Sequence, residues 1–196
     1  MKHAVILAHP DADSFNAAVA RAYAEAVTAG GGEAVVRDLY RLGFDPCLHA
    51  DELPWTAGHA PRADVVAERA LLADARVFVL VYPLWFNAPP AILKGYVDRV
   101  FAHGFGFGSI AGGTEPLLIG RSLISFTSSG APDRWVEETG AVRMLATAFD
   151  HHLGEMCGLA VADHVHFGGI VPGIRRDAVE ALLQRVRDRA AKFAGG

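Results

Sequence analysis

The sequence predicts one α/β domain over residues 1–196, with a five-stranded parallel sheet covered by helices on both faces. Short apolar runs alternate with segments of helical spacing along the chain, an order that favours parallel strands joined by right-handed helical crossovers. Hydrophobic residues make up 52% of the 196 residues, enough for one substantial core. Small and polar residues directly follow three of the apolar runs, at the sheet edge where α/β proteins bind ligands.

Composition excludes several classes of function. Charged residues make up 20% of the chain, the net charge is −4, and no basic run indicates nucleic-acid binding. No apolar stretch approaches membrane-spanning length, and the first residues lack the charged-then-apolar layout of a signal peptide. The two cysteines, Cys47 and Cys157, form no metal-binding or redox motif. We therefore expect a soluble cytoplasmic protein that binds no nucleic acid and inserts into no membrane.

The first predicted strand is the apolar run Ala4–Ala8, which stops before Pro10 because proline cannot donate to a ladder. Ser14 or Asn16 can cap the helix that follows, whose apolar residues have helical spacing as far as Val27. A strand, a polar turn and a helix N-terminus with free N–H groups form an anion site. The alternative interpretation is an ordinary capped connection.

The middle of the chain predicts a second strand over Glu33–Asp38 and a central strand over Arg76–Tyr82. Between them, Leu39–Arg62 is irregular and longer than most connections. Its apolar residues indicate that it docks on a surface, with a partner subunit as one candidate. Helical spacing over Ala63–Ala75 and Ala91–Phe101 predicts a helix on each side of the central strand.

A glycine-rich segment, Gly104–Gly113, fits the pattern G-x-G-x-x-A but follows a helix rather than a strand. That context contradicts a dinucleotide fingerprint and favours a flexible or ligand-approaching loop. The remaining expected elements are a strand, a largely helical stretch, a last strand and a closing amphipathic helix, over Arg121–Phe126, Trp135–Gly158, Leu159–Phe167 and Arg175–Phe193. We expect the helical stretch to be interrupted or capped near Gly140 and Gly154.

Five strands in this order fit a flavodoxin-like sheet of order 2-1-3-4-5, in which strands one, three and four are neighbours. The turns His9–Asn16, Pro83–Asn87 and Thr127–Gly130 then converge on one crevice. They offer donors for a phosphate, the flat apolar surface of Trp85 and Phe86, and small hydroxyls. A ligand with a phosphate tail and a planar ring fits all three turns, and a flavin is such a ligand. The alternative is that both aromatics pack in the core or an interface.

Several motifs, in this order along the chain, carry a family resemblance: Ala8-His9-Pro10, Ser14-Phe15-Asn16, Asp38-Leu39-Tyr40, Pro83-Leu84-Trp85-Phe86, Pro90-Ala91-Ile92-Leu93-Lys94-Gly95, Asp98-Arg99-Val100-Phe101, Gly104-Phe105 and Thr127-Ser128-Ser129-Gly130. The chain resembles the NAD(P)H:quinone oxidoreductase family, DT-diaphorase and its bacterial relatives, over about two thirds of its length. The resemblance implies a flavodoxin-like homodimer with FAD, or alternatively FMN, at its interface. It further implies hydride transfer from NADPH or NADH to the flavin and on to a quinone or similar small electrophile.

By position, the resemblance implies cofactor-binding roles for three groups of residues. Those near the flavin phosphates are His9, Ser14, Phe15 and Asn16. Those along the isoalloxazine ring are Pro83, Leu84, Trp85, Phe86 and Asn87. Those on its pyrimidine side are Thr127, Ser128, Ser129 and Gly130. The resemblance also implies that Leu39–Arg62 covers a dimer partner.

The chain departs from the family at three positions. Animal quinone reductases place a tyrosine and a histidine after the hydroxyl turn, where an ungapped alignment puts Trp135 and Ala141. Neither residue can take up a proton, so we predict no catalytic residue there, although Trp135 can stack on a substrate. Asp13 replaces a usual hydroxyl, and we expect its carboxylate to face solvent or cap the helix.

Four alternatives compete with the quinone reductase. The missing acid and base leave room for a reductase of nitro or azo compounds, or for a regulatory flavoprotein subunit of a potassium-efflux transporter. The third alternative is a metal site, because several residues have the spacing of metal ligands. They are His151, His152 and Glu155 on a helix, with His164 and His166 on one strand face. A serine hydrolase is excluded, because Ser128 and Ser129 form no G-x-S-x-G elbow.

Overall fold

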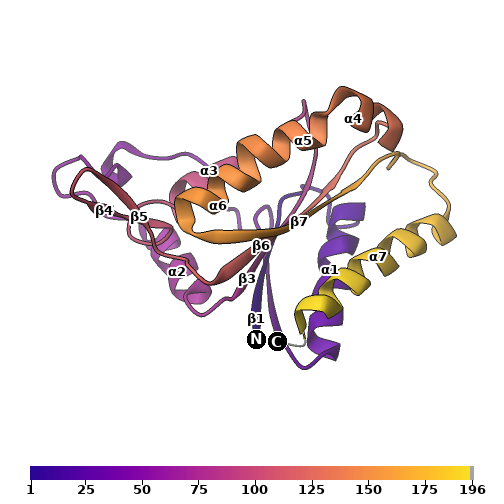
Figure 1. Cartoon of the computed structure of the whole chain (residues 1–196), viewed down its shortest axis with the longest axis horizontal. Helices are drawn as coiled ribbons and strands as arrows, with labels where there is room; N and C mark the ends of the chain where they lie inside the picture. Colours follow the sequence, from indigo (N-terminus) through magenta and orange to yellow (C-terminus); the bar gives the residue numbers. More distant parts are fainter. Residues whose placement is uncertain (195–196) are drawn as a thin grey trace.

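The computed structural model describes residues 1–194 and contains a five-stranded parallel sheet of order β2-β1-β3-β6-β7, with a separate antiparallel hairpin β4-β5 (Figure 1). The strands are β1 (Lys2–Leu7), β2 (Glu33–Asp38), β3 (Val77–Pro83), β4 (Phe107–Ile110), β5 (Gly113–Pro116), β6 (Arg121–Ser128) and β7 (Leu159–Phe167). With the hairpin left out, this order is the predicted flavodoxin-like 2-1-3-4-5, so the fold class is confirmed.

Helices cover both faces of the sheet. The helices are α1 (Phe15–Ala29), α2 (Ala63–Leu72), α3 (Ala91–Val100), α4 (Asp133–Thr139), α5 (Ala141–Leu145), α6 (His152–Cys157) and α7 (Arg176–Ala194), with a 3₁₀ turn η1 (Ala50–Glu52) and a π-helical turn η2 (Ala146–His151). Figure 1 shows α1 and α7 together on one face, and α3, α5 and α6 on the other. None of the helices within residues 1–194 is long and apolar enough to cross a membrane.

The two cores meet at β3, in which all seven residues are buried. Alternate side chains of a strand point to opposite faces, so Val79 and Val81 pack toward α1 and α7 while Phe78 and Leu80 pack toward α2 and α3. Burial of each such side chain contributes about 1.5–3 kcal/mol. This central strand therefore fixes the sheet edge from which the ligand-facing turns project.

Most predicted elements are confirmed, and those over Glu33–Asp38 and Leu159–Phe167 have the predicted bounds. Two predictions are wrong. One is the end of the strand before the third ligand-facing turn, and the other is the loop expected over the glycine-rich segment. Strand β6 continues two residues beyond Phe126, because it pairs with β7 as far as Ser128↔Phe167. Gly104–Gly113 contributes to the β4–β5 hairpin rather than to an unstructured loop, since Phe107–Ile110 pairs with the residues after Gly112.

The long helical stretch is broken where a glycine adopts a left-handed backbone. Gly140 has φ +68° and separates α4 from α5, as expected. The predicted break near Gly154 is wrong, because Gly154 lies inside α6. That helix ends at Cys157 and is capped by Gly158, which has φ +79°. Between these points η2 widens the helix by one π turn and brings Asp150 against the sheet, where it is fully buried.

The segment Leu39–Arg62 docks on its own chain through only part of its apolar side chains. Leu39 and Phe44 are buried in the core, while Tyr40, Leu42 and Leu48 are exposed and Trp55 is 80% exposed. The helical spacing over Ala63–Ala75 rests on the apolar residues Val66, Ala70 and Leu71, and it is wrong in detail. Val66 is exposed, and the buried face of α2 carries Glu68. Glu68 is held by an ion pair with Arg37, so a charged residue occupies a position that the pattern reserves for apolar ones.

Arg99 of α3 is the second buried charge that the pattern missed. Its guanidinium pairs with Glu52 at 2.9 Å and with Asp64 at 2.6 Å, and it donates to the carbonyl of Asp45. Only 1% of the Arg99 side chain is exposed, so these partners replace its hydration shell. This cluster ties the loop after β2 to α2 and α3.

Candidate active site

The three predicted turns converge on one crevice at the carboxyl ends of β1, β3 and β6. The crevice has a volume of about 150 Å³ and is lined by His9, Phe15, Asn16, Pro83, Leu84, Trp85, Ser128, Ser129, Gly130 and Ile170. Of these, Ile170 was not predicted. The signal for it is the pair Gly168-Gly169, which follows the last strand at the same sheet edge.

The first turn presents donors rather than cations. Ser14 caps α1 by accepting a hydrogen bond from the Ala17 N–H at 3.1 Å, so its hydroxyl serves the helix and does not line the crevice. Within residues 1–194, the N–H groups of Phe15 and Asn16 donate to no protein acceptor. These two donors and the helix dipole favour an anion at this point. Asp13 is exposed, as expected.

His9 is held in one orientation beside this helix N-terminus. Its Nδ1 accepts a hydrogen bond from the Asp11 N–H at 3.0 Å, and its ring lies 5.8 Å from the ring of Trp85. An Nδ1 that accepts leaves the ring proton of the neutral imidazole on Nε2. His9 can therefore donate to a ligand from that nitrogen.

Asn16 joins the first turn to the third. Its Oδ1 accepts a hydrogen bond from Ser128 Oγ at 2.8 Å, and both side chains are buried. Within the described part of the chain, the Asn16 Nδ2 group donates to no acceptor. The Ser128 hydroxyl therefore positions Asn16, while the two Nδ2 donors remain for a ligand.

The second turn is a tight reversal across the mouth of the crevice. Trp85 and Ala88 exchange backbone hydrogen bonds of 3.2 and 3.0 Å, and Phe86 and Asn87 between them have φ of +50° and +56°. Two consecutive positive φ values are the pattern of a type I′ turn, which is costly for a phenylalanine. Phe86 is fully exposed and Trp85 is 44% exposed, so neither aromatic is a core residue.

The third turn divides its side chains between two faces of the sheet. Ser128 and Ser129 line the crevice, as does Gly130, whose N–H donates to no described residue. Thr127 lies on the opposite face, where its Oγ1 is 2.9 Å from His164 Nε2 and 2.9 Å from His166 Nδ1. The side chain of Thr127 therefore does not face the crevice, since side chains alternate along β6.

Four of the predicted binding residues, Ser14, Phe86, Asn87 and Thr127, lie outside the crevice lining. Phe86 and Asn87 form the exposed tip of the second turn, so they flank the mouth of the crevice. Trp135 is 48% exposed on α4, and Ala141 is buried in α5. Neither lines the crevice, so the lining gives no support to the expectation that Trp135 stacks on a substrate.

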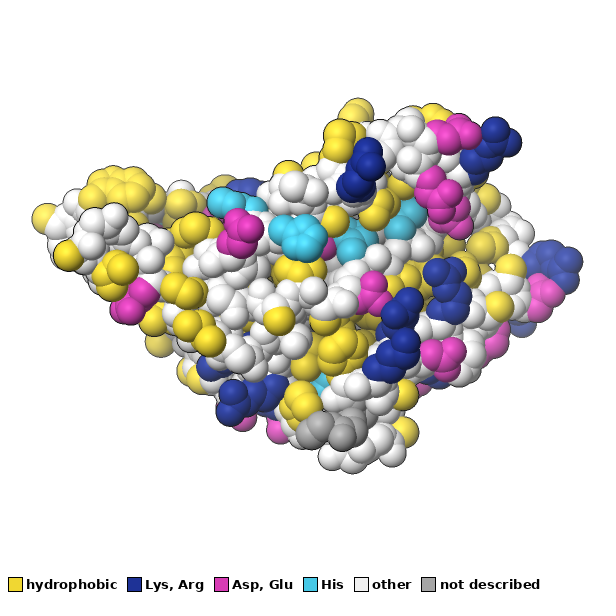
Figure 2. All heavy atoms as spheres, in the orientation of Figure 1, with side chains coloured by type: hydrophobic (Ala, Val, Ile, Leu, Met, Phe, Trp, Pro, Cys, Tyr) yellow, Lys and Arg dark blue, Asp and Glu magenta, His cyan; other side chains and the backbone are white. Residues whose placement is uncertain are grey.

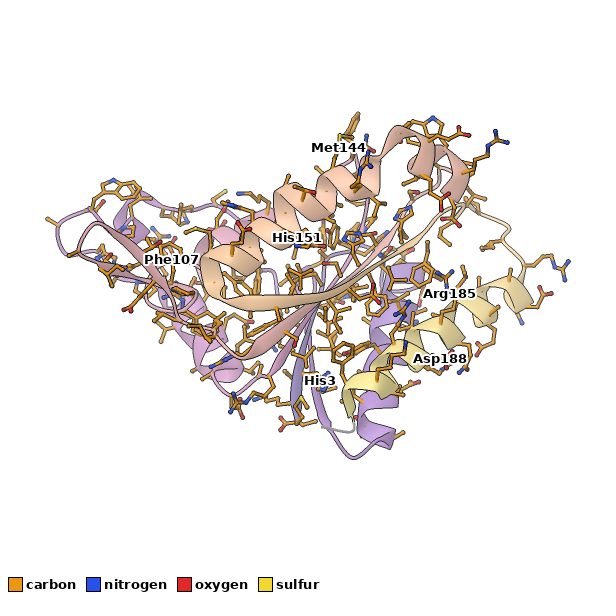
Figure 3. All side chains as sticks on the ribbon, viewed as in Figure 1. His3, Phe107, Met144, His151, Arg185 and Asp188 are labelled. Atoms are coloured by element: carbon orange, nitrogen blue, oxygen red, sulfur yellow. The ribbon has the colours of Figure 1, made fainter. Side chains whose placement is uncertain are left out.

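The histidines considered as metal ligands do not assemble. His164 is paired with Asp150 at 2.5 Å, on the sheet side of η2. Figure 3 shows His151 on the helix of α5 and α6, away from α7. Among residues 1–194, no group of three or more histidine, cysteine or carboxylate side chains is arranged to hold a metal ion.

The crevice encloses less space than a complete ligand site. Small-molecule sites usually measure about 300–1,000 Å³, against about 150 Å³ here. Larger hollows lie elsewhere, among them one of about 340 Å³ between α3 and α6, one of about 580 Å³ beside His164 and His166, one of about 600 Å³ beside Met1 and Arg76, and one of about 410 Å³ beside Glu155 and Gly158. The crevice differs in that unpaired donors from three turns converge on it, so one chain supplies a donor-rich wall whose aromatic mouth is open.

Comparisons with known proteins agree with this geometry. A family model described as "Flavodoxin-like fold" matches residues 1–190. An uncharacterized NAD(P)H oxidoreductase of Haemophilus influenzae is 33% identical over 171 residues, covering 87% of this chain and 85% of that protein. NAD(P)H dehydrogenase [quinone] 1 of Cavia porcellus is 30% identical over 145 residues, 65% of this chain and 53% of that protein. The structure of an NAD(P)H:quinone oxidoreductase from Methanothermobacter marburgensis is 27% identical, with a TM-score of 0.82 and 98% of each chain covered.

Proposed function

This chain belongs to the flavodoxin-like fold family, and from that membership and its crevice we propose that it is a flavin-dependent NAD(P)H oxidoreductase that reduces a quinone. The observation that carries the proposal is the convergence of unpaired donors from three separate turns. Backbone N–H groups of Phe15, Asn16, Phe86, Asn87 and Gly130 donate to no acceptor within residues 1–194. Phe15, Asn16 and Gly130 line the crevice, and Phe86 and Asn87 flank its mouth.

The donors are divided as a flavin requires. The N-terminus of α1 and the Nε2 of His9 suit the phosphate, which needs hydrogen bonds from neutral groups because no described lysine or arginine lines the crevice. Trp85 and Phe86 offer flat apolar surfaces for a ring, and the N–H groups beside them suit its polar edge. Ser129 and Gly130 suit the pyrimidine side. When bound, the flavin supplies the hydride chemistry, while the protein binds and orients it.

We propose that the site is completed by a second copy of the chain. The crevice of one chain is too small to enclose a flavin, and the residues around its mouth expose apolar surface to solvent. Phe86 and Trp55 are 105% and 80% exposed, which is unusual for large aromatic side chains outside an interface. A homodimer covers both residues and closes the crevice over the ring.

The finer assignments follow the family resemblance. We expect FAD, with FMN as the alternative, and we expect NADPH or NADH as the hydride donor in the cytoplasm. The acceptor is a quinone, and nitro or azo compounds are the second class of electrophile. The regulatory role on a transporter gains no support from the relatives described above, which are named as oxidoreductases.

An absorption spectrum of the purified protein tests the proposal. We expect flavin bands that bleach when NADPH or NADH is added without oxygen and return when menadione is added. Mass spectrometry of the released pigment distinguishes FAD from FMN, and light scattering measures whether the flavin-bound protein is a dimer. A colourless protein that takes up neither flavin would overturn the cofactor assignment. A bound flavin that nicotinamide does not reduce would overturn the oxidoreductase assignment.

A further inference from the structure

A continuous chain of hydrogen bonds leaves the crevice at Ser129 and ends at a buried carboxylate. Ser129 Oγ is 3.0 Å from His166 Nε2, and His166 Nδ1 is 2.9 Å from Thr127 Oγ1. Thr127 Oγ1 is 2.9 Å from His164 Nε2, and His164 Nδ1 is 2.5 Å from Asp150 Oδ2. At the far end, Ser125 Oγ donates to Asp150 Oδ1 at 2.9 Å.

The two histidines of this hydrogen-bond chain also face a second cavity. His164 and His166 line the hollow of about 580 Å³, which is enclosed by α4, α5 and Arg185 of α7. Figure 2 shows a row of histidine side chains along the groove below the helix of α5 and α6, and Figure 3 shows Arg185 on α7 across that groove. The hydrogen-bond chain therefore joins the crevice, which Ser129 lines, to the second cavity, which His164 and His166 line.

Every group in this hydrogen-bond chain has a partner when each donor points away from the crevice. Ser129 Oγ–H then donates to His166 Nε2, and His166 Nδ1–H donates to Thr127 Oγ1. Thr127 Oγ1–H donates to His164 Nε2, and His164 Nδ1–H donates to an ionised Asp150. In this state both imidazoles are neutral and no group lacks a partner.

Every group also has a partner when the hydrogen bonds run in the opposite direction, toward the crevice. Ser129 Oγ also lies 3.0 Å from the Ala131 carbonyl, to which it can donate, and its oxygen then accepts from His166 Nε2–H. The Thr127 hydroxyl reverses and donates to His166 Nδ1, which has lost its proton. Its oxygen in turn accepts from His164 Nε2–H.

The reversed state holds one more proton than the first. Because His164 Nε2 now carries a proton, a neutral His164 would present a bare Nδ1 to the carboxylate of Asp150 at 2.5 Å. Two acceptors cannot share such a contact, so a further proton lies between them. His166 is neutral in both states and only exchanges its tautomer.

We propose that Ser129, His166, Thr127, His164 and Asp150 form a relay that delivers one proton to the crevice for each substrate reduced. This proposal rests on the proposed function, in which NAD(P)H supplies a hydride and a quinone becomes a hydroquinone. That reaction consumes one proton, which is the difference between the two states. The relay also supplies what Trp135 and Ala141 lack at the family's acid and base positions.

The proton moves by exchange of bonds along the chain. Ser129 releases its O–H proton into the crevice and takes the Nε2 proton of His166, which takes the proton of Thr127 at Nδ1. Thr127 takes the Nε2 proton of His164, and the proton between His164 and Asp150 stays on His164 Nδ1. Water in the second cavity then returns a proton to the His164–Asp150 pair, and the donors reverse again.

The surroundings keep His166 neutral, as the relay requires. Burial lowers the pKa of His166 to about 4, with Asp133 acting to raise it and His164 to lower it further. The charged groups that line the cavity beside the histidines come from three helices: Asp133 and Glu137 of α4, Arg143 of α5 and Arg185 of α7. Asp150 of η2 contacts His164 from the helical layer that packs on the sheet.

The substitution Thr127→Val tests the relay, because it removes the central hydroxyl from the face opposite the crevice. Thr127→Ser restores the hydroxyl, and Thr28→Val makes the same change on α1, where the exposed hydroxyl donates to the Ala24 carbonyl outside the relay. With flavin bound, we expect Thr127→Val to slow quinone reduction at least about tenfold in single turnovers and to abolish its solvent deuterium effect. Thr127→Ser and Thr28→Val should keep the wild-type rate and effect. An unchanged rate and effect in Thr127→Val would overturn the relay.

A second measurement uses the protein without flavin. Nitrogen-15 NMR of labelled histidines in the wild type should show His166 changing from the Nδ1–H to the Nε2–H tautomer as the His164–Asp150 pair gains its proton. In Thr127→Val the two events should separate. A His166 tautomer that stays fixed while the pair titrates overturns the relay, whereas failure of the full chain to bind or reduce flavin overturns only the proposed function.

Discussion

Ser128 Oγ and Asn16 Oδ1 are joined by a buried hydrogen bond of 2.8 Å across 112 positions of sequence. The bond fixes the end of β6 against the first turn of α1. It also sets the direction of the Asn16 amide, since the oxygen points to Ser128 and the Nδ2 donors remain free. Two turns that bind different parts of a ligand are thereby held in register.

Replacing Asn16 by Asp separates this structural role from ligand binding. A carboxylate still accepts from Ser128, but it removes two donors and places negative charge at the helix N-terminus proposed to hold a phosphate. We expect Asn16→Asp to weaken flavin binding at least about tenfold, with little change in the free energy of unfolding. Fluorescence titration with the flavin and urea unfolding measure the two quantities.

Ser128→Ala is the complementary variant. It leaves the buried Asn16 oxygen without its donor, so we expect the free energy of unfolding to fall by about 1–3 kcal/mol. Equal stability of Ser128→Ala and wild type would show that water or another group replaces the bond.

Phe86 combines a positive φ of +50° with a fully exposed ring. Phe86→Gly removes the strain of the left-handed backbone, so we expect the flavin-free protein to gain up to about 1 kcal/mol in free energy of unfolding. The same change removes a proposed ring contact, so flavin binding should weaken. Ile119→Gly is the matched control, because Ile119 is 70% exposed without a positive φ and its loss should not stabilise the protein.

The Arg99 cluster predicts a stability that depends on pH. The Arg99 hydrogen bond lowers the pKa of Asp64, and for Glu52 the bonds from Arg99 and His49 outweigh the rise that burial causes. Carboxyl groups with a lowered folded-state pKa stabilise the protein above their ordinary values of 3.8 and 4.5. That stability is lost as pH falls through the lowered pKa values, and urea unfolding between pH 7 and pH 2 should show it.

Arg99→Met should reverse the sign of this dependence. The variant leaves Glu52 buried without its guanidinium, at a cost of about 3–5 kcal/mol at neutral pH. Protonation of the orphaned carboxyl relieves the cost, so the difference from wild type should shrink at acidic pH. A difference that is constant with pH would show that packing, rather than charge, is what Arg99 contributes.

Gly95 lies where α3 approaches the loop after β2 closely. A Cβ at this position would lie 2.1 Å from the carbonyl oxygen of Pro46, which real contacts do not allow. We therefore expect Gly95→Ala to destabilise the protein despite the higher helix propensity of alanine, which favours it by about 1 kcal/mol. Gly113→Ala, where nothing lies within 4 Å, should have little effect, and thermal unfolding compares the two.

Most residues that the resemblance implies for the site line the crevice, and Thr127 shows why one of the others does not. Thr127 was grouped with Ser128 and Ser129 because the strand was expected to end at Phe126. The ladder with β7 carries β6 on to Ser128, and the alternation of the strand then turns Thr127 away. A strand's end depends on its neighbour, and β7 begins more than thirty residues later in the sequence.

The sequence by itself determined the alternation of strands and helices, the sheet order and the three turns at one edge, because these follow from local periodicity and from the handedness of crossovers. Only the tertiary structure decided where charges are buried and which polar groups meet. Arg99 is paired with Glu52 across 47 positions, and Thr127 meets His164 across 37. Hydrogen bonds act over about 3 Å, so their partners are fixed only when packing brings distant segments into contact.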